Sequence, residues 1–342
     1  MNQFAIGVDL GGTSLRIAAV ESSGKILEKI TTGTEVARRD RVIDEMCDAV
    51  RTLASKYRAT DELAGIGVGV PGIIDMATGM LRWSPNLPGW QDYPVREEIE
   101  GRIGTPVFLE NDANAAALGE KWLGAAVGVD DMCMLTLGTG VGGGLVLEGR
   151  IWHGMAGMAG EVGHTNIDPD GVPCGCGSRG CLEQYASATA IKRMALEAIA
   201  SGKAPELARA MSQDPEFSSK VVHQMASEGD AAARAIFHRV GTALGIALAD
   251  LINVLDLPTY VIGGGVAAAW DTFAPTMLET LKRYSYIYRV TTATPPGGDG
   301  ASRSGKKTVI TRALLGSDAG LIGASRLPMM PEHAKRVSGV DV

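Results

Sequence analysis

The sequence lacks any run of about 18 uncharged apolar residues, which excludes a membrane-spanning helix. Its first residues show no basic segment and no cleavage site, so we expect no export and a cytoplasmic location. Basic residues are fewer than acidic ones: the chain has 32 Lys and Arg and 39 Asp and Glu, which gives a net charge of −7. Without a basic patch, a nucleic-acid-binding protein is disfavoured.

Glycine, in contrast, is abundant. The chain has 342 residues, a length that suits two domains, and 45 of them are glycine. These glycines are not concentrated in a low-complexity tract. They occur in short clusters between apolar segments that are typical of strands. Such clusters favour tight turns at which the backbone approaches a ligand. Strands interspersed with amphipathic helices predict the α/β class.

Two glycine turns occupy equivalent places in two similar segments. Residues 7–26 and 135–151 each predict a strand, a glycine turn, a second strand and a short turn, which indicates an internal duplication. The turns are Asp9–Thr13 and Gly138–Gly144. Main-chain N–H groups in such a turn can converge on one anion, although each turn alone is also explained as a plain hairpin. Two matched turns, with a third glycine run at Gly263–Gly265, favour phosphate binding.

Side chains in these turns add to that prediction. The hydroxyls of Thr13 and Thr139 are further donors for a phosphate. Asp9 leaves two roles open, since it could stabilise the turn or hold a hydrated Mg²⁺ near the phosphates.

Other glycine patterns match known nucleotide-binding motifs but lack the flanking structure that those motifs require. The residues from Gly67 to Gly72 match a dinucleotide-binding expression, but they lie within and just after a strand, and an Asn- and Pro-rich loop follows. The residues from Gly138 to Gly143 match the same expression, yet a strand follows where a helix is required. A P-loop-like pattern from Gly300 ends in lysine at position 307 instead of Ser or Thr. We predict a mobile surface loop over Pro295–Lys307.

A cluster of metal-ligating residues gives the most specific signal. His164, Cys174, Cys176 and Cys181 follow the spacing H-x9-C-x-C-x4-C, with glycines between them that let the chain wrap a small ion. In a chain without an export signal, such a cluster predicts metal binding before disulfides. One imidazole and three thiolates suit tetrahedral Zn²⁺ and leave no position for a catalytic water. We therefore expect a structural zinc ion.

Carboxylates and an amide are candidate ligand-binding residues. Asn111 and Asp112 follow a predicted strand and precede a predicted helix, where open α/β sheets bind ligands. Asp112 is equally well explained as a helix N-cap. Glu161 and Glu183 flank the predicted zinc loop. Alone they would be surface groups, but on a rigid metal loop they could accept hydrogen bonds from a polyol.

In chain order, the motifs are DLGGT at 9–13, ENDANA at 110–115, LGTGVGGG at 137–144, GEVGH at 160–164, CGCGSRGCLE at 174–183 and VIGGGV at 261–266. Together they resemble the ROK family of bacterial sugar kinases and repressors, and within it the ATP-dependent glucokinases. The resemblance runs from about residue 4 to about residue 326, and it is the combination of motifs that makes it specific.

The resemblance implies a two-domain, actin-like ATPase (ribonuclease H-like) fold with a central cleft. We expect residues 1–115 with about 318–342 to form a small domain, and 116–317 to form a large domain containing the zinc loop 164–181. The family also suggests a homodimer or homotetramer. No family motif covers residues 203–228, so no role is transferred to them.

The resemblance further implies a kinase that uses ATP with Mg²⁺ to phosphorylate a hexose, with Asp112 as general base. The residues implied to contact the sugar are Asn86, Asn111, Asp112, Glu161, His164 and Glu183. Those implied to hold ATP are Asp9, Gly11, Gly12, Thr13, Gly138, Thr139, Gly140, Gly263, Gly264 and Gly265.

Three alternatives stay open on the sequence. Glucose is the expected acceptor, but a kinase for N-acetylmannosamine, allose or mannose would share these motifs. A sugar-responsive repressor of the same family would need a helix-turn-helix domain, for which we expect no room before Asp9. A sugar-sensing protein without turnover is disfavoured by the presence of Asp112.

Overall fold

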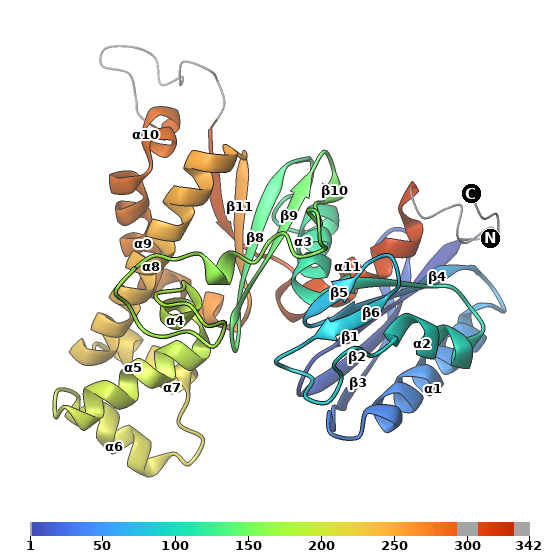
Figure 1. The fold of residues 1–342 in the computed structure, drawn as a ribbon, viewed down its shortest axis with the longest axis horizontal. Helices are drawn as coiled ribbons and strands as arrows, with labels where there is room; N and C mark the ends of the chain where they lie inside the picture. Colours follow the sequence, from blue (N-terminus) through green and yellow to red (C-terminus); the bar gives the residue numbers. More distant parts are fainter. Residues whose placement is uncertain (1, 293–306, 332–342) are drawn as a thin grey trace. The chain divides into compact units, whose positions relative to one another are not determined.

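The computed structural model describes residues 2–292 and 307–331 (Figure 1). The chain forms two compact units. Unit 1 comprises Met1–Asp130, Gly144–Gly160 and Leu314–Val342, and unit 2 comprises Asp131–Gly143 and Glu161–Ala313. Each contains strands and helices, so the predicted α/β class is confirmed. The loop predicted over Pro295–Lys307 lies outside the described residues, apart from Lys307 itself.

The sheet of unit 1 has the strand order β3-β2-β1-β4-β7. Antiparallel hairpins join β1, β2 and β3, while β4 runs parallel to β1 and β7 runs parallel to β4. The strands are β1 (Gln3–Leu10), β2 (Ser14–Glu21), β3 (Ile26–Gly33), β4 (Glu62–Val70) and β7 (Val107–Asn111). A separate hairpin pairs β5 (Ile73–Asp75) with β6 (Met80–Trp83).

Helices cover both faces of this sheet (Figure 1). They are α1 (Arg39–Tyr57), α2 (Val95–Ile103), α3 (Asp112–Leu123) and α11 (Ala319–Arg326), with the short turns η3 (Gly316–Asp318) and η4 (Leu327–Met329) beside α11. Apolar residues of α1 and α2 share one buried core with β1, β2, β4 and β7. The opposite face packs against α11.

Glycine allows α11 to lie directly on the sheet. A Cβ added to Gly7 in β1 would lie 2.4 Å from the carbonyl oxygen of Leu321, and one on Gly67 in β4 would lie 1.8 Å from that of Ala324. Successive residues of a strand point to opposite faces, and Val8 accordingly belongs to the core shared with α1. Helix packing therefore explains Gly67, the first glycine of the dinucleotide-like pattern.

The helices α3 and α11 of unit 1 are in close contact. The whole of α3 belongs to unit 1 because α3 and α11 approach each other at the backbone. A Cβ on Gly119 would lie 2.2 Å from the carbonyl oxygen of Ala319, and one on Gly323 would lie 1.6 Å from that of Ala115. Only small residues permit so close a helix contact.

The second sheet has the order β10-β9-β8-β11-β12, with β11 parallel to both β8 and β12 and β10 antiparallel to β9. Its strands are β8 (Met132–Leu137), β9 (Val141–Leu147), β10 (Arg150–Ile151), β11 (Thr259–Gly263) and β12 (Val309–Arg312). Its order repeats that of the first sheet strand for strand. The predicted duplication is therefore confirmed at the level of topology.

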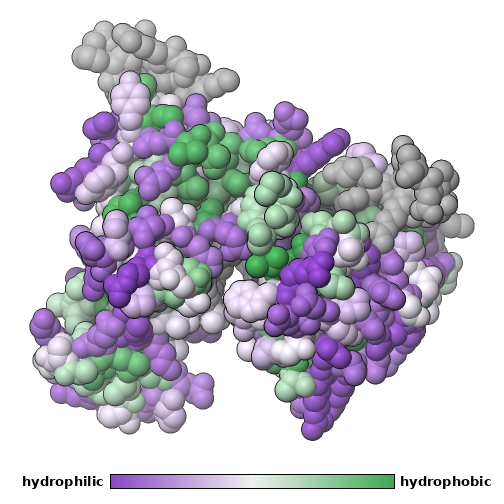
Figure 2. All heavy atoms as spheres, viewed as in Figure 1, coloured by the Kyte–Doolittle hydropathy of each residue, from purple (hydrophilic) through white to green (hydrophobic). Residues whose placement is uncertain are grey.

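In unit 2, several helices pack against the long helix α8 (Ala231–Leu255). The other helices are α4 (Glu183–Ala186), α5 (Ala188–Ala200), α6 (Pro205–Gln213), α7 (Ser219–Glu228), α9 (Trp270–Tyr284) and α10 (Tyr286–Thr292), with the short turns η1 (Val162–His164) and η2 (Gly265–Ala269). Of the described helices, α8 alone is long and apolar enough to cross a membrane, and 61% of its apolar window is buried within the protein. Core helices pass the same test, so this is weak support for a membrane span. Figure 2 shows hydrophilic side chains over most of the face drawn.

A buried carboxylate holds the chain where it re-enters unit 1. Glu120 in α3 is fully buried, and it accepts hydrogen bonds from the N–H groups of Ala125 (2.8 Å), Leu314 (3.1 Å) and Leu315 (2.8 Å). Three donors on one carboxylate compensate for its burial. The segment after β12 is thereby fixed to α3.

We expect Glu120→Ala to lower the free energy of unfolding by roughly 1–3 kcal/mol, because three partly buried N–H groups lose their acceptor. Urea unfolding followed by tryptophan fluorescence measures the change. Glu97→Ala, at an exposed position of α2, serves as the control and should shift the midpoint little. Equal midpoints for the two variants would contradict this role of Glu120.

Candidate functional site

The predicted site residues fall into two groups, one in each unit. Asp9, Gly11, Gly12, Thr13, Asn86, Asn111 and Asp112 belong to unit 1, whereas Gly138, Thr139, Gly140, Glu161, His164, the three cysteines, Glu183 and Gly263–Gly265 belong to unit 2. Each group is described within its own unit.

In unit 1, the first glycine turn lies against the loop that contains Asn86. The N–H of Gly11 donates to the carbonyl oxygen of Ser14 at 2.8 Å, which closes the turn between β1 and β2. A Cβ on Gly12 would lie 2.9 Å from the carbonyl oxygen of Asn86. The turn expected to bind phosphate and the loop expected to bind sugar are thus neighbours, and a side chain at position 12 would separate them.

Asp9 lies near the end of β1, opposite Arg16 of β2. The Arg16 guanidinium approaches its carboxylate at 3.3 Å and also donates to the carbonyl oxygen of Ser317 at 2.8 Å. Burial raises the pKa of Asp9, and the positive charge of Arg16 opposes that shift. A carboxylate oxygen is a ligand that Mg²⁺ accepts, so the donor chemistry of Asp9 fits the role left open in the sequence.

The junction between β7 and α3 holds Asn111 and Asp112. The N-cap of α3 is Asn111, and its Oδ1 accepts from the N–H groups of Ala113 (2.9 Å) and Asn114 (3.2 Å). Its Nδ2 donates to the carbonyl oxygen of Gly72 at 3.1 Å. The alternative of Asp112 as N-cap is therefore wrong: Asp112 is the first residue of the helix, where the helix dipole stabilises a negative charge.

The sequence did not indicate the buried hydrogen bonds that surround Asp112. Glu110 is 2% exposed, and its Oε1 accepts from the N–H of Asn111 (2.9 Å) and from Nδ2 of Asn114 (3.0 Å). Its Oε2 lies 2.7 Å from Nε2 of His153, which follows β10. A glutamate directly after the apolar residues of a strand was the available signal, because a buried carboxylate requires donors.

The hydrogen bond from His153 to Glu110 raises the pKa of His153, while burial acts in the opposite direction. A raised pKa means that the protonated ring stabilises the folded state. That contribution is fully present below the unfolded value of about 6.5 and is lost as the pH rises through the folded value.

We expect the melting temperature of wild type to exceed that of His153→Gln by more at about pH 5.5 than at about pH 8.5. Thermal unfolding of both proteins at the two pH values tests this. His238→Gln, at an exposed position of α8, controls for the substitution itself. A gap between wild type and His153→Gln that stays constant with pH would refute the expectation.

In unit 2, the second glycine turn is held by the start of α5. Ala188 donates its N–H to the carbonyl oxygen of Gly138 at 2.8 Å, and Thr189 donates its hydroxyl to that of Thr139 at 2.7 Å. These bonds engage carbonyl groups of the turn, which otherwise would repel an anion.

Two further predicted residues lie beside this turn. Oε2 of Glu183 accepts from the N–H of Val141 at 3.0 Å, and a Cβ on Gly140 would lie 2.3 Å from the same oxygen. Gly264 has a φ of +83°, and a Cβ there would lie 2.5 Å from the carbonyl oxygen of Leu137. Glycine is therefore required at position 264, whereas a Cβ at position 140 would displace the Glu183 carboxylate. The structure brings Glu183, the second turn and the Gly263–Gly265 run together.

The four predicted zinc ligands converge. Their ligand atoms all lie within 4.8 Å of one another, with 3.8 Å between Cys174 Sγ and His164 Nδ1 and 3.7 Å between Cys176 Sγ and Cys181 Sγ. Tetrahedral Zn²⁺ with bonds of about 2.3 Å to sulfur places its sulfurs about 3.8 Å apart. The arrangement therefore fits a four-coordinate zinc ion. Gln184 donates to Cys174 Sγ at 3.6 Å from outside the cluster.

His164 presents its second ring nitrogen to Glu161. With Nδ1 near Cys174, its Nε2 lies 3.9 Å from Oε2 of Glu161. Both side chains are exposed, Glu161 directly before η1 and His164 at its end. A metal ion on Nδ1 would leave Nε2 as an N–H donor with a fixed direction, so this edge of the cluster presents a donor and an acceptor side by side.

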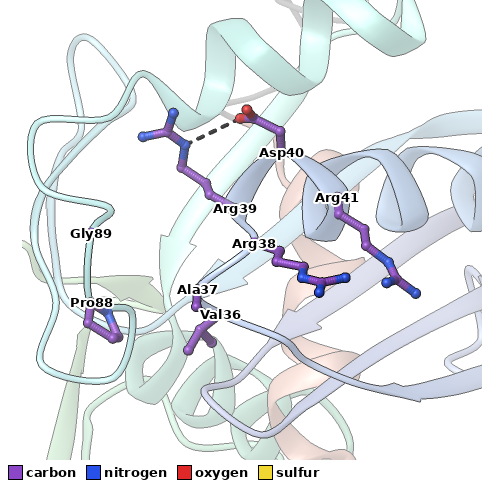
Figure 3. Close-up of a pocket in the computed structure, with 8 residues that line it drawn as sticks. All are labelled: Val36, Ala37, Arg38, Arg39, Asp40, Arg41, Pro88 and Gly89. Atoms are coloured by element: carbon purple, nitrogen blue, oxygen red, sulfur yellow. Dashed lines mark hydrogen bonds and ion pairs between the residues drawn. The ribbon is translucent and has the colours of Figure 1, made fainter.

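A hollow of about 450 Å³ lies beside the start of α1 (Figure 3). Its lining residues are Val36, Ala37, Arg38, Arg39, Asp40, Arg41, Pro88 and Gly89. Each arginine lies close to a carboxylate, with Arg38 3.3 Å from Glu35, Arg39 3.4 Å from Asp40 and Arg41 2.7 Å from Glu45. Because these charges are compensated, we assign no ligand to the hollow. A second one, of about 280 Å³, includes Thr13 in its lining.

Comparison with known proteins agrees with these features. A sequence model described as the ROK family matches residues 5–329. The chain is 39% identical to a glucokinase from Halalkalibacterium halodurans, over 97% of each chain. It is 33% identical to an N-acetylmannosamine kinase from Yersinia pestis, over 83% of this chain and 90% of that one. A ROK glucokinase from Streptomyces griseus, solved with glucose and AMPPNP, is 32% identical with a TM-score of 0.75, over 95% of this chain and 98% of that one.

Proposed function

Because the chain belongs to the ROK family, we propose that it is an ATP-dependent glucokinase, which converts ATP and D-glucose to ADP and D-glucose 6-phosphate. The observation that carries this proposal is identity to glucokinases along nearly the whole chain. The solved relative that contains glucose and an ATP analogue supports the same substrate pair. The two sheets of equal strand order support an actin-like fold.

We assign the role of general base to Asp112. Deprotonation of a sugar hydroxyl at neutral pH requires an acceptor in place when the oxygen attacks. Asp112 would take the proton from the 6-hydroxyl of glucose as that oxygen bonds to the γ-phosphorus, while the bond from the γ-phosphorus to the ADP oxygen breaks. The α3 N-terminus and the bonds around Asn111 and Glu110 hold the carboxylate in place.

The glycine turns are proposed to hold the nucleotide. Backbone N–H groups at Gly11–Thr13 and Gly138–Gly140 would bind phosphate oxygens, and Gly263–Gly265 would lie against the adenosine. Asp9 is the residue proposed to hold Mg²⁺, whose charge offsets that of the phosphates when it is bound. Asn86, Asn111, Glu161, His164 and Glu183 are proposed to bind the sugar.

The cysteine cluster is proposed to hold a structural zinc ion. With all four ligands supplied by His164, Cys174, Cys176 and Cys181, no open position is left for a reacting group. Its effect on the reaction would be indirect, through the direction of the His164 Nε2–H group.

A hexose panel tests the proposal. Purified protein with Mg-ATP is assayed by coupled ADP release with glucose, mannose, allose and N-acetylmannosamine. We expect glucose to give the highest kcat/KM. Absence of sugar-dependent ADP release would overturn the kinase assignment. A preference for N-acetylmannosamine would favour the second candidate, which the relative from Yersinia pestis supports.

A further inference from the structure

The penultimate residue of β7, Glu110, is a carboxylate that contacts the chain on both sides of Asp112. Oε1 of Glu110 accepts from the N–H of Asn111, directly before Asp112, and from the side chain of Asn114, two residues after it. Glu110 and Asn114 are each 2% exposed, so water does not replace these bonds. The position of the backbone around Asp112 therefore depends on the position of the Glu110 carboxylate.

Glu110 is in turn fixed by a residue from a distant part of the chain. His153 is 43 positions away, and its Nε2 lies 2.7 Å from the remaining oxygen, Oε2. The segment around His153 has contacts of its own, since Trp152 donates its N–H to the carbonyl oxygen of Leu145 (2.8 Å) and Ala159 donates to that of His153 (3.1 Å). The histidine thus reaches Glu110 from an ordered backbone.

We propose that Glu110 and His153 are positioning residues for phosphoryl transfer, which hold the first turn of α3 so that Asp112 meets the sugar hydroxyl. The inference rests on the proposed role of Asp112. Neither residue is assigned contact with substrate. Their effect is on the location of the Asp112 carboxylate, and therefore on kcat more than on nucleotide binding.

The contribution of His153 to the position of Asp112 can be judged from the effect of removing its imidazole on Glu110. Without the imidazole, Oε2 of Glu110 would be a buried acceptor with no donor, which is costly. The carboxylate would then rotate toward water, and this change weakens its bonds to Asn111 and Asn114. Misplacement of a reacting group by about 1 Å can cost about 100-fold in rate.

The test uses two substitutions, His153→Leu and His153→Gln. Each is made in the wild-type protein and in the Asp112→Asn variant. Leucine removes the donor, whereas the glutamine amide can still donate to Glu110. We expect His153→Leu to lower kcat for glucose by roughly 10- to 100-fold with little change in KM for ATP. We expect His153→Gln to lose less than about threefold, because a neutral donor is retained. Thermal unfolding of each variant verifies that it is folded at the assay temperature.

The Asp112→Asn background separates positioning from general stabilisation. If His153 acts through Asp112, leucine at position 153 should lower the residual rate of Asp112→Asn by less than about twofold. An equal loss in both backgrounds would overturn the proposal, as would an unchanged kcat in His153→Leu. Wild-type protein without sugar-dependent ADP release would instead overturn the glucokinase assignment, and this inference with it, before any variant is compared.

Discussion

Replacing Asp112 with asparagine is expected to lower kcat for glucose by about 10²- to 10⁴-fold, the usual contribution of a positioned general base. Asparagine has the same shape but cannot accept the hydroxyl proton. Its side-chain oxygen can still accept from the N–H of Ala113, which Asp112 Oδ1 does at 2.9 Å, so α3 should still begin at the same residue. KM for ATP should change little, because Asp112 is assigned no contact with the nucleotide.

Steady-state kinetics with the coupled ADP assay measure this effect. Asp48→Asn, an exposed substitution on α1, is the matched control and should leave both kcat and KM near wild type. If Asp112→Asn turned over glucose at the wild-type rate, the base would have to be another group, even where the kinase activity itself was established.

Loss of the zinc cluster is expected to have the largest effect on stability. We expect about one zinc ion per chain in the purified protein. Cys181→Ala should lose it and melt at a markedly lower temperature, because binding to a structural site of this kind contributes on the order of 10 kcal/mol to folding in small zinc domains. Cys181 is fully buried and belongs to the ligand set, so its replacement removes one of the four ligands.

Metal analysis together with thermal unfolding measures both effects. Cys47→Ala is the control, because Cys47 is a buried thiol of α1 and is not among the clustered ligands. It should keep the zinc stoichiometry of wild type. Protein that contains no zinc while its thiols are intact would contradict the zinc assignment.

The sequence predicted features that short stretches of chain determine. The cysteine cluster spans few residues, and its ligand spacing is a local property. The two glycine hairpins repeat the same order of strand and turn, and their sheets have the same topology. For such features, nearby residues carry enough information to predict both the structure and the chemistry.

Features that depend on distant contacts could not be predicted in the same way. Glu110 and His153 are 43 positions apart, and no periodicity links them. The extent of α3 within unit 1 depends on glycines that meet α11 across the fold, such as Gly119 and Gly323. The choice of Asn111 over Asp112 as N-cap depends on backbone dihedral angles, since both residue types fill that position well.

The placement of α11 has a consequence for synthesis on the ribosome. The strands β1, β2 and β4 leave the ribosome early, but the helix that covers one of their faces, Ala319–Arg326, is synthesised about 250 residues after β4. Until α11 has been synthesised, Ala18 and Val20 lack their partner Leu321. The nascent sheet would therefore present an apolar face until that helix has emerged.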